Sequence, residues 1–371
     1  MGLETYLGAA ALVGVARYAA AGRPDLTGVL CGLAVLCRPD LAVPGAVLAL
    51  VLKHKHGSRR RASPAQPAAR LAGARRSLAL AGLVVATAAA LALPWHLFSW
   101  FALGGFVPDT LWLKTLEPSF GVGGPTMLTA PATLYAAHWP VATALTALPV
   151  ALGVCAAGWV VRWWRQPGPQ LVLALLAAGW AHYVAMVAIG ATPYAWYFAP
   201  LVACSTVAVA VAAAYLSPRP TAISTVVLTA LCLATAGPMP WDTPPIYGNI
   251  ATTAQYATIG SQLAPLTHGQ PVAGPGEVGD LAFYSSVPVV DAYGDRAVAK
   301  PYLDQRYQHA GLMLRAFLRW NWAHRIDPPP PKLRYRLSYA SLGLPPGRVV
   351  ASWPIVTPTR TTPDQVVLTE D

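Results

Sequence analysis

The chain has 371 residues, of which 55% are hydrophobic and only 11% are charged, and its formal net charge is +11. The charged share is less than half of the roughly 25% found in soluble globular domains, so the composition indicates a membrane protein with a soluble appendage. The basic residues gather in connections between apolar runs, which favours a role in membrane orientation over nucleic-acid binding.

The apolar runs come first along the chain. A helix that crosses the hydrocarbon needs about 20 mostly apolar residues. Runs of this kind predict complete spans at Thr5–Ala21, Leu78–Trp100, Pro140–Val161, Leu171–Gly190, Tyr197–Leu216 and Thr221–Ala236. A further apolar tract, Leu26–Leu52, is interrupted by Arg38-Pro39-Asp40.

The connection Lys53–Arg76 fixes the expected orientation. It is dense in Lys and Arg and has no acidic residue, so it is predicted to be cytoplasmic. A single crossing by Leu26–Leu52 would place it outside, whereas a hairpin of two short halves keeps it inside. We therefore predict a hairpin with Arg38 and Asp40 at its outer turn, and about eight membrane segments in all. The loops 101–139 and 191–196 then lie outside.

After Gly237 proline and polar residues become frequent. Ala254–Leu266 is expected to be a helix, and Pro301–Ile326 a single amphipathic helix that ends before Pro328–Pro331. Strands are expected at Pro271–Ala273, Val287–Tyr293, Leu333–Tyr339, Val349–Trp353 and Val366–Leu368. The predicted fold is mainly α: a polytopic helical bundle at 1–236, followed by a small extracytoplasmic α/β domain at 237–371.

Arg38 and Asp40 are charges at or near the membrane, where a charged side chain is costly and faces a cavity or a partner. One interpretation is a mutually neutralising pair that turns the hairpin. The other is that Arg38 holds the phosphate of a lipid-linked donor and Asp40 contacts the substrate. Both interpretations stay open at this point.

Asp109 and Lys114 follow an aromatic helix end that includes Trp95 and Phe101. Such a belt is typical of the membrane–water boundary. Lys114 is a candidate counter-charge for a leaving phosphate, and Asp109 a candidate general base or orienting group for an acceptor hydroxyl. The alternative is an ordinary solvated exit loop.

The remaining candidates are few. Trp196 and Tyr197, in the aromatic stretch 193–200, either stack on a sugar or lipid chain or only anchor a helix end. Glu4 is a carboxylate at the outer start of the first span. The histidines lack the paired spacing of a metal site, and no nucleotide-binding loop is present, so we expect no cofactor, with a divalent cation as an open alternative. The cysteines all fall in apolar runs, which indicates packing thiols.

Short motifs in a consistent order carry a resemblance to a known family. They are Gly2-Leu3-Glu4-Thr5, the GLAVLCRPD run at 32–40, Val107-Pro108-Asp109-Thr110 with Lys114, and the GDLAFYSSVPVVDAY run at 279–293. Together the chain resembles bacterial multi-span glycosyltransferases of the GT-C fold, especially the actinobacterial arabinofuranosyltransferase and mannosyltransferase type. The likeness spans essentially the whole chain.

The resemblance implies transfer of a sugar from a polyprenyl-phosphate donor to an envelope glycan or lipoglycan, at the outer face of the cell membrane, with no nucleic acid involved. It favours Glu4, Arg38 and Lys114 as site residues. Family members have further N-terminal spans with an acidic outer loop before the element that is Gly2-Leu3-Glu4-Thr5 here, so we expect a misassigned start, a fragment or a degenerate copy. Asp109 stands where family members usually have Asn. A non-catalytic relative that binds a lipid-linked glycan or scaffolds a partner is therefore the main alternative. A transporter is a weaker one, because only one broken tract is found where two matching ones are expected.

Overall fold

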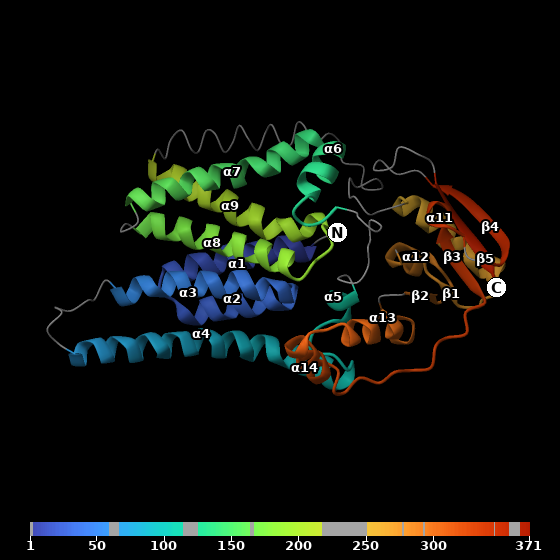
Figure 1. Ribbon diagram of the computed structural model, residues 1–371, viewed down its shortest axis with the longest axis horizontal. Helices are drawn as coiled ribbons and strands as arrows, with labels where there is room; N and C mark the ends of the chain where they lie inside the picture. Colours follow the sequence, from blue (N-terminus) through green and yellow to red (C-terminus); the bar gives the residue numbers. More distant parts are fainter. Residues whose placement is uncertain are drawn as a thin grey trace. The chain divides into compact units, whose positions relative to one another are not determined.

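The computed structural model describes residues 3–58, 67–113, 125–163, 167–216, 251–276, 278–291, 294–344, 346–355 and 364–371. Over these residues the chain is mainly helical, with one small sheet (Figure 1). It divides into two compact units, one made of residues 1–99 and 118–233 and the other of residues 100–117 and 234–371. Residues 100–117 thus belong to the second unit, whereas the sequence analysis placed them with the membrane helices.

The first unit is a helical bundle. Its elements are α1 (Leu3–Ala20), α2 (Pro24–Cys37), the short 3-10 helix η1 (Pro39–Leu41), α3 (Ala42–Ser58), most of α4 (Pro67–Ala102), the π-helical turn η2 (Pro131–Tyr135), α6 (Ala136–His138), α7 (Pro140–Trp163), α8 (Pro167–Ala188) and α9 (Ala195–Leu216).

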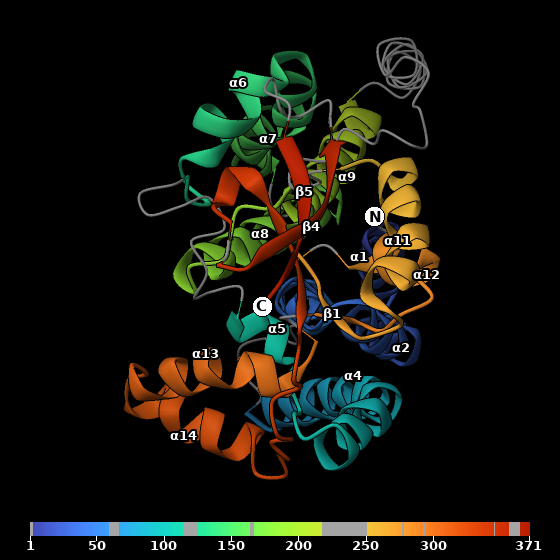
Figure 2. The same ribbon diagram turned by 90° about the vertical axis from the view of Figure 1, so that its right-hand side faces the viewer.

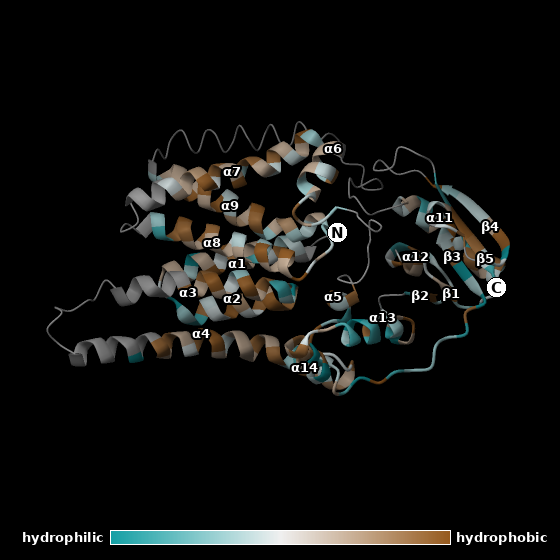
Figure 3. Ribbon diagram, viewed as in Figure 1, coloured by the Kyte–Doolittle hydropathy of each residue, from teal (hydrophilic) through white to brown (hydrophobic). Residues whose placement is uncertain are grey.

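In the part of the chain that the structure describes, four helices are long and apolar enough to cross a membrane. They are Leu78–Ala102, Pro140–Gly158, Pro169–Ala188 and Ala195–Tyr215. These coincide with four of the spans expected from the sequence, and their residues form the brown stretches of Figure 3. The first expected span is the helix α1, and the one expected at Thr221–Ala236 lies outside the described residues. The total of about eight membrane segments stays a prediction.

The interrupted tract folds as two helices that meet at Arg38. Arg38 has extended backbone angles (φ −159°, ψ 122°), and Pro39 begins η1 directly after it. The residue before a proline is pushed out of the helical region by the proline ring, which explains the break at this position. Figure 1 shows α2 and α3 running in opposite directions on either side of the break, as a hairpin does.

Buried small and aliphatic side chains hold the bundle together. Leu12 and Val15 of α1, Leu48 of α3 and Leu175 of α8 are almost fully buried in one core. α2 also comes very close to α4, because a Cβ added at Gly28 would lie 1.7 Å from Thr87 Oγ1 and 2.5 Å from the Val84 carbonyl oxygen. The absence of a side chain at Gly28 is therefore required for this helix–helix approach. Among the described residues, Cys31, Cys155 and Cys204 are free thiols.

The second unit combines helices with a five-stranded sheet of order β2-β1-β3-β5-β4. Its helices are α5 (Asp109–Leu113), α11 (Thr253–Thr267), α12 (Gly279–Tyr284), α13 (Arg296–Gln308), α14 (Leu312–Asn321) and the 3-10 helix η3 (Ala340–Leu342). Its strands are β1 (Val272–Ala273), β2 (Val289–Val290), β3 (Tyr335–Tyr339), β4 (Arg348–Ile355) and β5 (Asp364–Glu370). β1 pairs in parallel with β2 and β3, and β5 pairs antiparallel with β3 and β4.

Side-chain alternation explains how this sheet is covered. In β3, Tyr335, Leu337 and Tyr339 are buried and the residues between them are not, as expected for a strand with one covered face. They share a core with Ile259 and Leu263 of α11 and with residues of α12. Figure 2 shows β4 and β5 with these two helices beside them.

One expected element of the second unit is wrong. The sequence predicted a single amphipathic helix at Pro301–Ile326, but the structure has two helices, α13 and α14, with a break between Gln308 and Leu312. Gly311 is the N-cap of α14 with ψ 165°, outside the helical region, and glycine is a poor residue for a helix interior. Arg315 reinforces the break because its Nη2 donates to the carbonyl oxygens of Gln308 and Ala310. The expected helix at Ala254–Leu266 and the five expected strands are confirmed within a few residues.

Candidate functional site

Arg38 is placed by the helix break and points across the bundle. Because its backbone is extended, its side chain leaves the axis of α2 and reaches the start of α9. Nη1 donates to the backbone oxygen of Trp196 at 3.0 Å, and Cζ lies 5.0 Å from the centroid of the Tyr197 ring. The structure thus brings together the sequence candidates Arg38 and Trp196, which are 158 positions apart, and Tyr197 beside them.

Asp40 holds the other edge of the same guanidinium. Its carboxylate accepts from Arg38 Nε at 3.1 Å and from Nη2 at 2.6 Å, which is a bidentate pair. Both side chains are only 12% exposed. Two opposite charges removed from water must compensate each other, and a bidentate pair does this with fixed geometry.

His182 completes the cluster, and the sequence analysis missed it. The side chain comes from α8, is fully buried, and places Nε2 2.7 Å from Asp40 Oδ2. An ionised carboxylate only accepts hydrogen bonds, so Nε2 is the ring nitrogen that carries the proton toward Asp40. Nδ1 has no hydrogen-bond partner in the described part of the chain. In the sequence, His182 is marked only as a single imidazole in the middle of an apolar span. It has no second histidine at metal-ligand spacing, so that criterion did not select it.

Contacts within the described part of the chain use three of the five N–H groups of the Arg38 guanidinium. It has one N–H on Nε and two on each terminal nitrogen. Asp40 and the Trp196 oxygen take the Nε hydrogen and one hydrogen on each terminal nitrogen. Within the described residues, one N–H on Nη1 and one on Nη2 have no hydrogen-bond partner, and a guanidinium uses such N–H groups to bind a phosphate or carboxylate.

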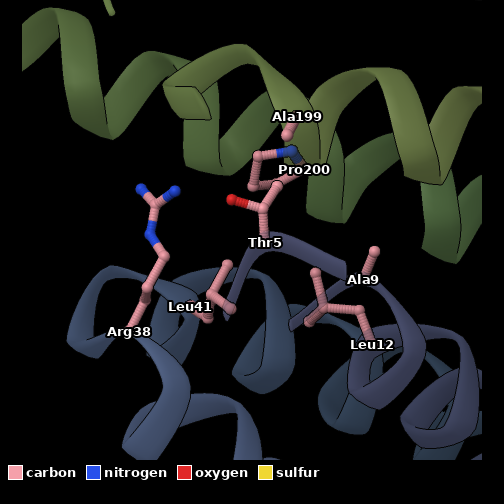
Figure 4. Close-up of a pocket in the computed structure, with 7 residues that line it drawn as sticks. All are labelled: Thr5, Ala9, Leu12, Arg38, Leu41, Ala199 and Pro200. Carbon is pink, nitrogen blue, oxygen red and sulfur yellow. The ribbon is translucent and has the colours of Figure 1, made fainter. Parts of the chain in front are cut away.

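A small hollow lies beside Arg38, between α1 and α9. It encloses about 10 Å³, close to the space of a single water molecule. Figure 4 shows Arg38 and Thr5 directed toward α9, where Pro200 lies opposite. The other lining residues are Ala9, Leu12, Leu41 and Ala199, so the surface next to the guanidinium is mostly apolar.

The Arg-Pro-Asp-Leu sequence of this site occurs twice, at 23–26 and at 38–41, and the two copies flank α2. Arg23 also pairs with Asp25 by two hydrogen bonds, of 3.3 and 3.1 Å. That pair is exposed, with 58% and 49% of the two side chains accessible. The motif alone is therefore a local way to start a helix, and only the surroundings of the second copy make it a candidate site.

Aromatic side chains surround the start of α9. The rings of Tyr194 and Trp196 are stacked, with centroids 4.3 Å apart and planes 5° from parallel. Tyr197 is buried together with Met127 and Met186. Tyr135 of η2 donates its hydroxyl to the Pro193 oxygen at 2.6 Å, which ties this turn to the rest of the bundle. Trp196 thus has one face covered by Tyr194.

Asp109 belongs to the second unit and is engaged by its own neighbours. Its carboxylate accepts from Arg296 Nε at 3.1 Å and from the indole Nε1 of Trp322 at 2.8 Å, and Arg296 Nη2 forms an ion pair with it at 3.0 Å. The sequence analysis did not single out Arg296 or Trp322. These contacts give Asp109 a clear structural use, and its role as a general base stays a prediction.

The other candidates can be placed only in part. Glu4 lies in the first turn of α1, directly before Thr5, so its backbone is at the same end of the bundle as Arg38. Lys114 lies outside the described residues. Over the described ranges, no group of three or more His, Cys, Asp or Glu side chains is arranged to hold a metal ion.

Comparison with known proteins gives no relative for this chain: no protein-family model, no curated protein and no solved structure matches it.

Proposed function

We propose that this chain is an integral membrane glycosyltransferase of the GT-C type, which takes a sugar from a polyprenyl-phosphate donor and transfers it to an extracytoplasmic glycan or lipoglycan of the cell envelope. The observation that carries the proposal is the buried guanidinium of Arg38. A guanidinium held rigidly in an apolar bundle, with one N–H left on each terminal nitrogen, suits the phosphate of a donor whose lipid tail lies among helices.

The two ends of the bundle support a proposed orientation in the membrane. Arg38 contacts the start of α9, so the α2–α3 break and the α8–α9 turn lie at one end, while α3 and α4 are joined at the other end through the basic connection (Figure 1). If that connection is cytoplasmic, the Arg38 end faces outward. In this orientation the chain leaves α4 on the outer side, so we propose that the second unit is extracytoplasmic.

The expected chemistry is direct displacement. The acceptor hydroxyl oxygen attacks the anomeric carbon, the bond from that carbon to the phosphate oxygen breaks, and the hydroxyl proton passes to a carboxylate. Arg38 stabilises the charge on the departing phosphate, and Lys114 is proposed to add a second cation. Glu4 is the candidate base, because its position in α1 is next to the hollow beside Arg38.

A second candidate is a non-catalytic protein that binds a lipid-linked glycan with the same Arg38 site. One observation favours it: the Asp109 carboxylate is occupied by Arg296 and Trp322, as in a structural contact. This candidate predicts that the donor binds without transfer.

Binding and transfer should be measured separately on the full chain. A photoreactive polyprenyl phosphate is incubated with the purified protein in vesicles, and cross-linking is compared between Arg38→Ala and the matched control Arg23→Ala. We expect Arg38→Ala to lose cross-linking and Arg23→Ala to keep it. Equal cross-linking of both variants would remove Arg38 from the donor site. Transfer of a radiolabelled sugar then separates the enzyme from the binding protein.

A further inference from the structure

α14 is an amphipathic helix whose outer face exposes large apolar side chains, almost fully at Leu312 and Met313 and in part at Phe317 and Trp320, whose rings also contact other aromatic rings. Leu314, Leu318 and Asn321 are spaced by four and three residues and form its inner face, on which Leu318 and Asn321 are fully buried. On the outer face, Leu312 and Met313 are 86% and 88% exposed, and Phe317 and Trp320 are also exposed. Large apolar side chains exposed together on one helix mark an interaction surface.

The last turn of α4 is packed directly against α14. The indole Nε1 of Trp100 donates to the Trp320 backbone oxygen at 3.1 Å, and the two indole rings have centroids 5.1 Å apart. Trp100 and Phe101 also each lie 4.7 Å from the His324 ring. Trp100 is in the last turn of the apolar stretch Leu78–Ala102, which is long enough to cross a membrane.

The loop that leaves α4 locks this arrangement. Asn321 accepts from the Val107 backbone N–H at 2.7 Å and donates to the Val107 oxygen at 3.3 Å. Gly104, at φ +74°, passes so close that an added Cβ would lie 2.8 Å from Arg325 Cα and 2.9 Å from the His324 oxygen. α14 therefore cannot move away from the end of α4 without breaking these contacts.

We infer that α14 lies flat in the membrane interface and buries its outer face, made of Leu312, Met313, Phe317 and Trp320, in the boundary between lipid headgroups and acyl chains. The helix is fixed at the depth where an apolar span ends, and that depth is the boundary layer. Trp320 is an aromatic residue of the kind found in this boundary layer. Arg319 is exposed beside the outer face, where its charge can bind anionic headgroups. The proposal does not depend on the glycosyltransferase activity.

Photo-cross-linking of the full chain tests the inference. Benzoylphenylalanine replaces Met313, and the protein is irradiated in nanodiscs of phosphatidylcholine and phosphatidylglycerol. Val349 of β4, which is an exposed apolar residue of the same unit, serves as the matched control. We expect lipid adducts at position 313 and only background at position 349, as detected by mass spectrometry.

Two outcomes would overturn the inference. Adducts at position 313 that join two polypeptides would show that a second copy of the chain covers this face. Equal lipid adducts at positions 313 and 349, or none at position 313, would show that α14 is no more membrane-embedded than the edge of the sheet. If the variant at Met313 does not fold, the same probe at Phe317 replaces one ring with a larger one and gives the same readout.

Discussion

His182 and Asp40, 142 positions apart in the sequence, meet inside the helical bundle with Nε2 2.7 Å from Oδ2. This contact joins α8 to the break between α2 and α3. It also gives the Asp40 carboxylate a second partner besides Arg38.

His182→Ala should destabilise the protein by about 1–3 kcal/mol, because it leaves a buried carboxylate oxygen without one of its donors. His182→Gln retains an N–H donor on a side chain of similar reach and should recover part of the loss. Thermal unfolding in detergent measures both variants. If the thermal unfolding midpoint of His182→Ala equals that of the wild type, the Asp40–His182 contact contributes nothing to the stability of the fold.

Arg38→Ala should cost about 3–5 kcal/mol of stability, since removal of one partner leaves the other charge buried and unpaired. Arg23→Ala removes the same residue from the same Arg-Pro-Asp-Leu sequence in an exposed setting and should change the midpoint little. The double variant Arg38→Ala/Asp40→Ala should lose less stability than Arg38→Ala alone, because it leaves no unpaired aspartate. If Arg23→Ala and Arg38→Ala lose equal stability, burial does not distinguish the two copies.

Gly104→Ala should destabilise the second unit strongly. The added Cβ would meet Arg296 Nη1 at 2.4 Å as well as the backbone of the segment after α14, and φ is +74°. Gly269→Ala is the matched control, because φ there is +76° and nothing lies within 4 Å of its Cβ. The control should lose only the backbone strain, about 1–2 kcal/mol. Comparable losses in both variants would show that the close approach at Gly104 is easily relieved.

Glu370 makes the second unit sensitive to acid. The Arg348 hydrogen bond, together with the charges of Arg334 and Arg348, lowers the pKa of this carboxyl below its usual value of 4.5. A lowered folded-state pKa stabilises the protein above the unfolded pKa, and this contribution is lost as the pH falls through the folded pKa. Melting temperatures should therefore drop on acidification below 4.5 more steeply for the wild type than for Glu370→Gln.

Arg348→Gln provides the control for this pH effect. Without its first partner the pKa of Glu370 moves back toward 4.5, so the acid loss should be smaller than in the wild type and should be complete at a higher pH. Identical pH profiles for the wild type, Arg348→Gln and Glu370→Gln would show that this carboxylate does not set the acid stability.

Local features were readable from the sequence because short-range chemistry decides them. Runs of apolar residues gave the four long helices, and alternation gave strands such as β3. Pro39 broke the interrupted tract at Arg38 through the clash that a proline ring imposes on the preceding residue. The split between α13 and α14 was missed because a weak local breaker, Gly311, acts there together with the Arg315 contacts.

The candidate site was decided by packing between distant segments. The sequence pointed to Arg38, Asp40, Trp196 and Tyr197 separately, but it did not select His182 or pair Asp109 with Arg296. Two identical Arg-Pro-Asp-Leu stretches each pair their arginine with their aspartate at the start of a helix, but one pair is exposed and the other is buried. Local sequence determines where a helix starts and stops, whereas the environment of a charge depends on which other helices pack around it, and only the tertiary structure specifies that.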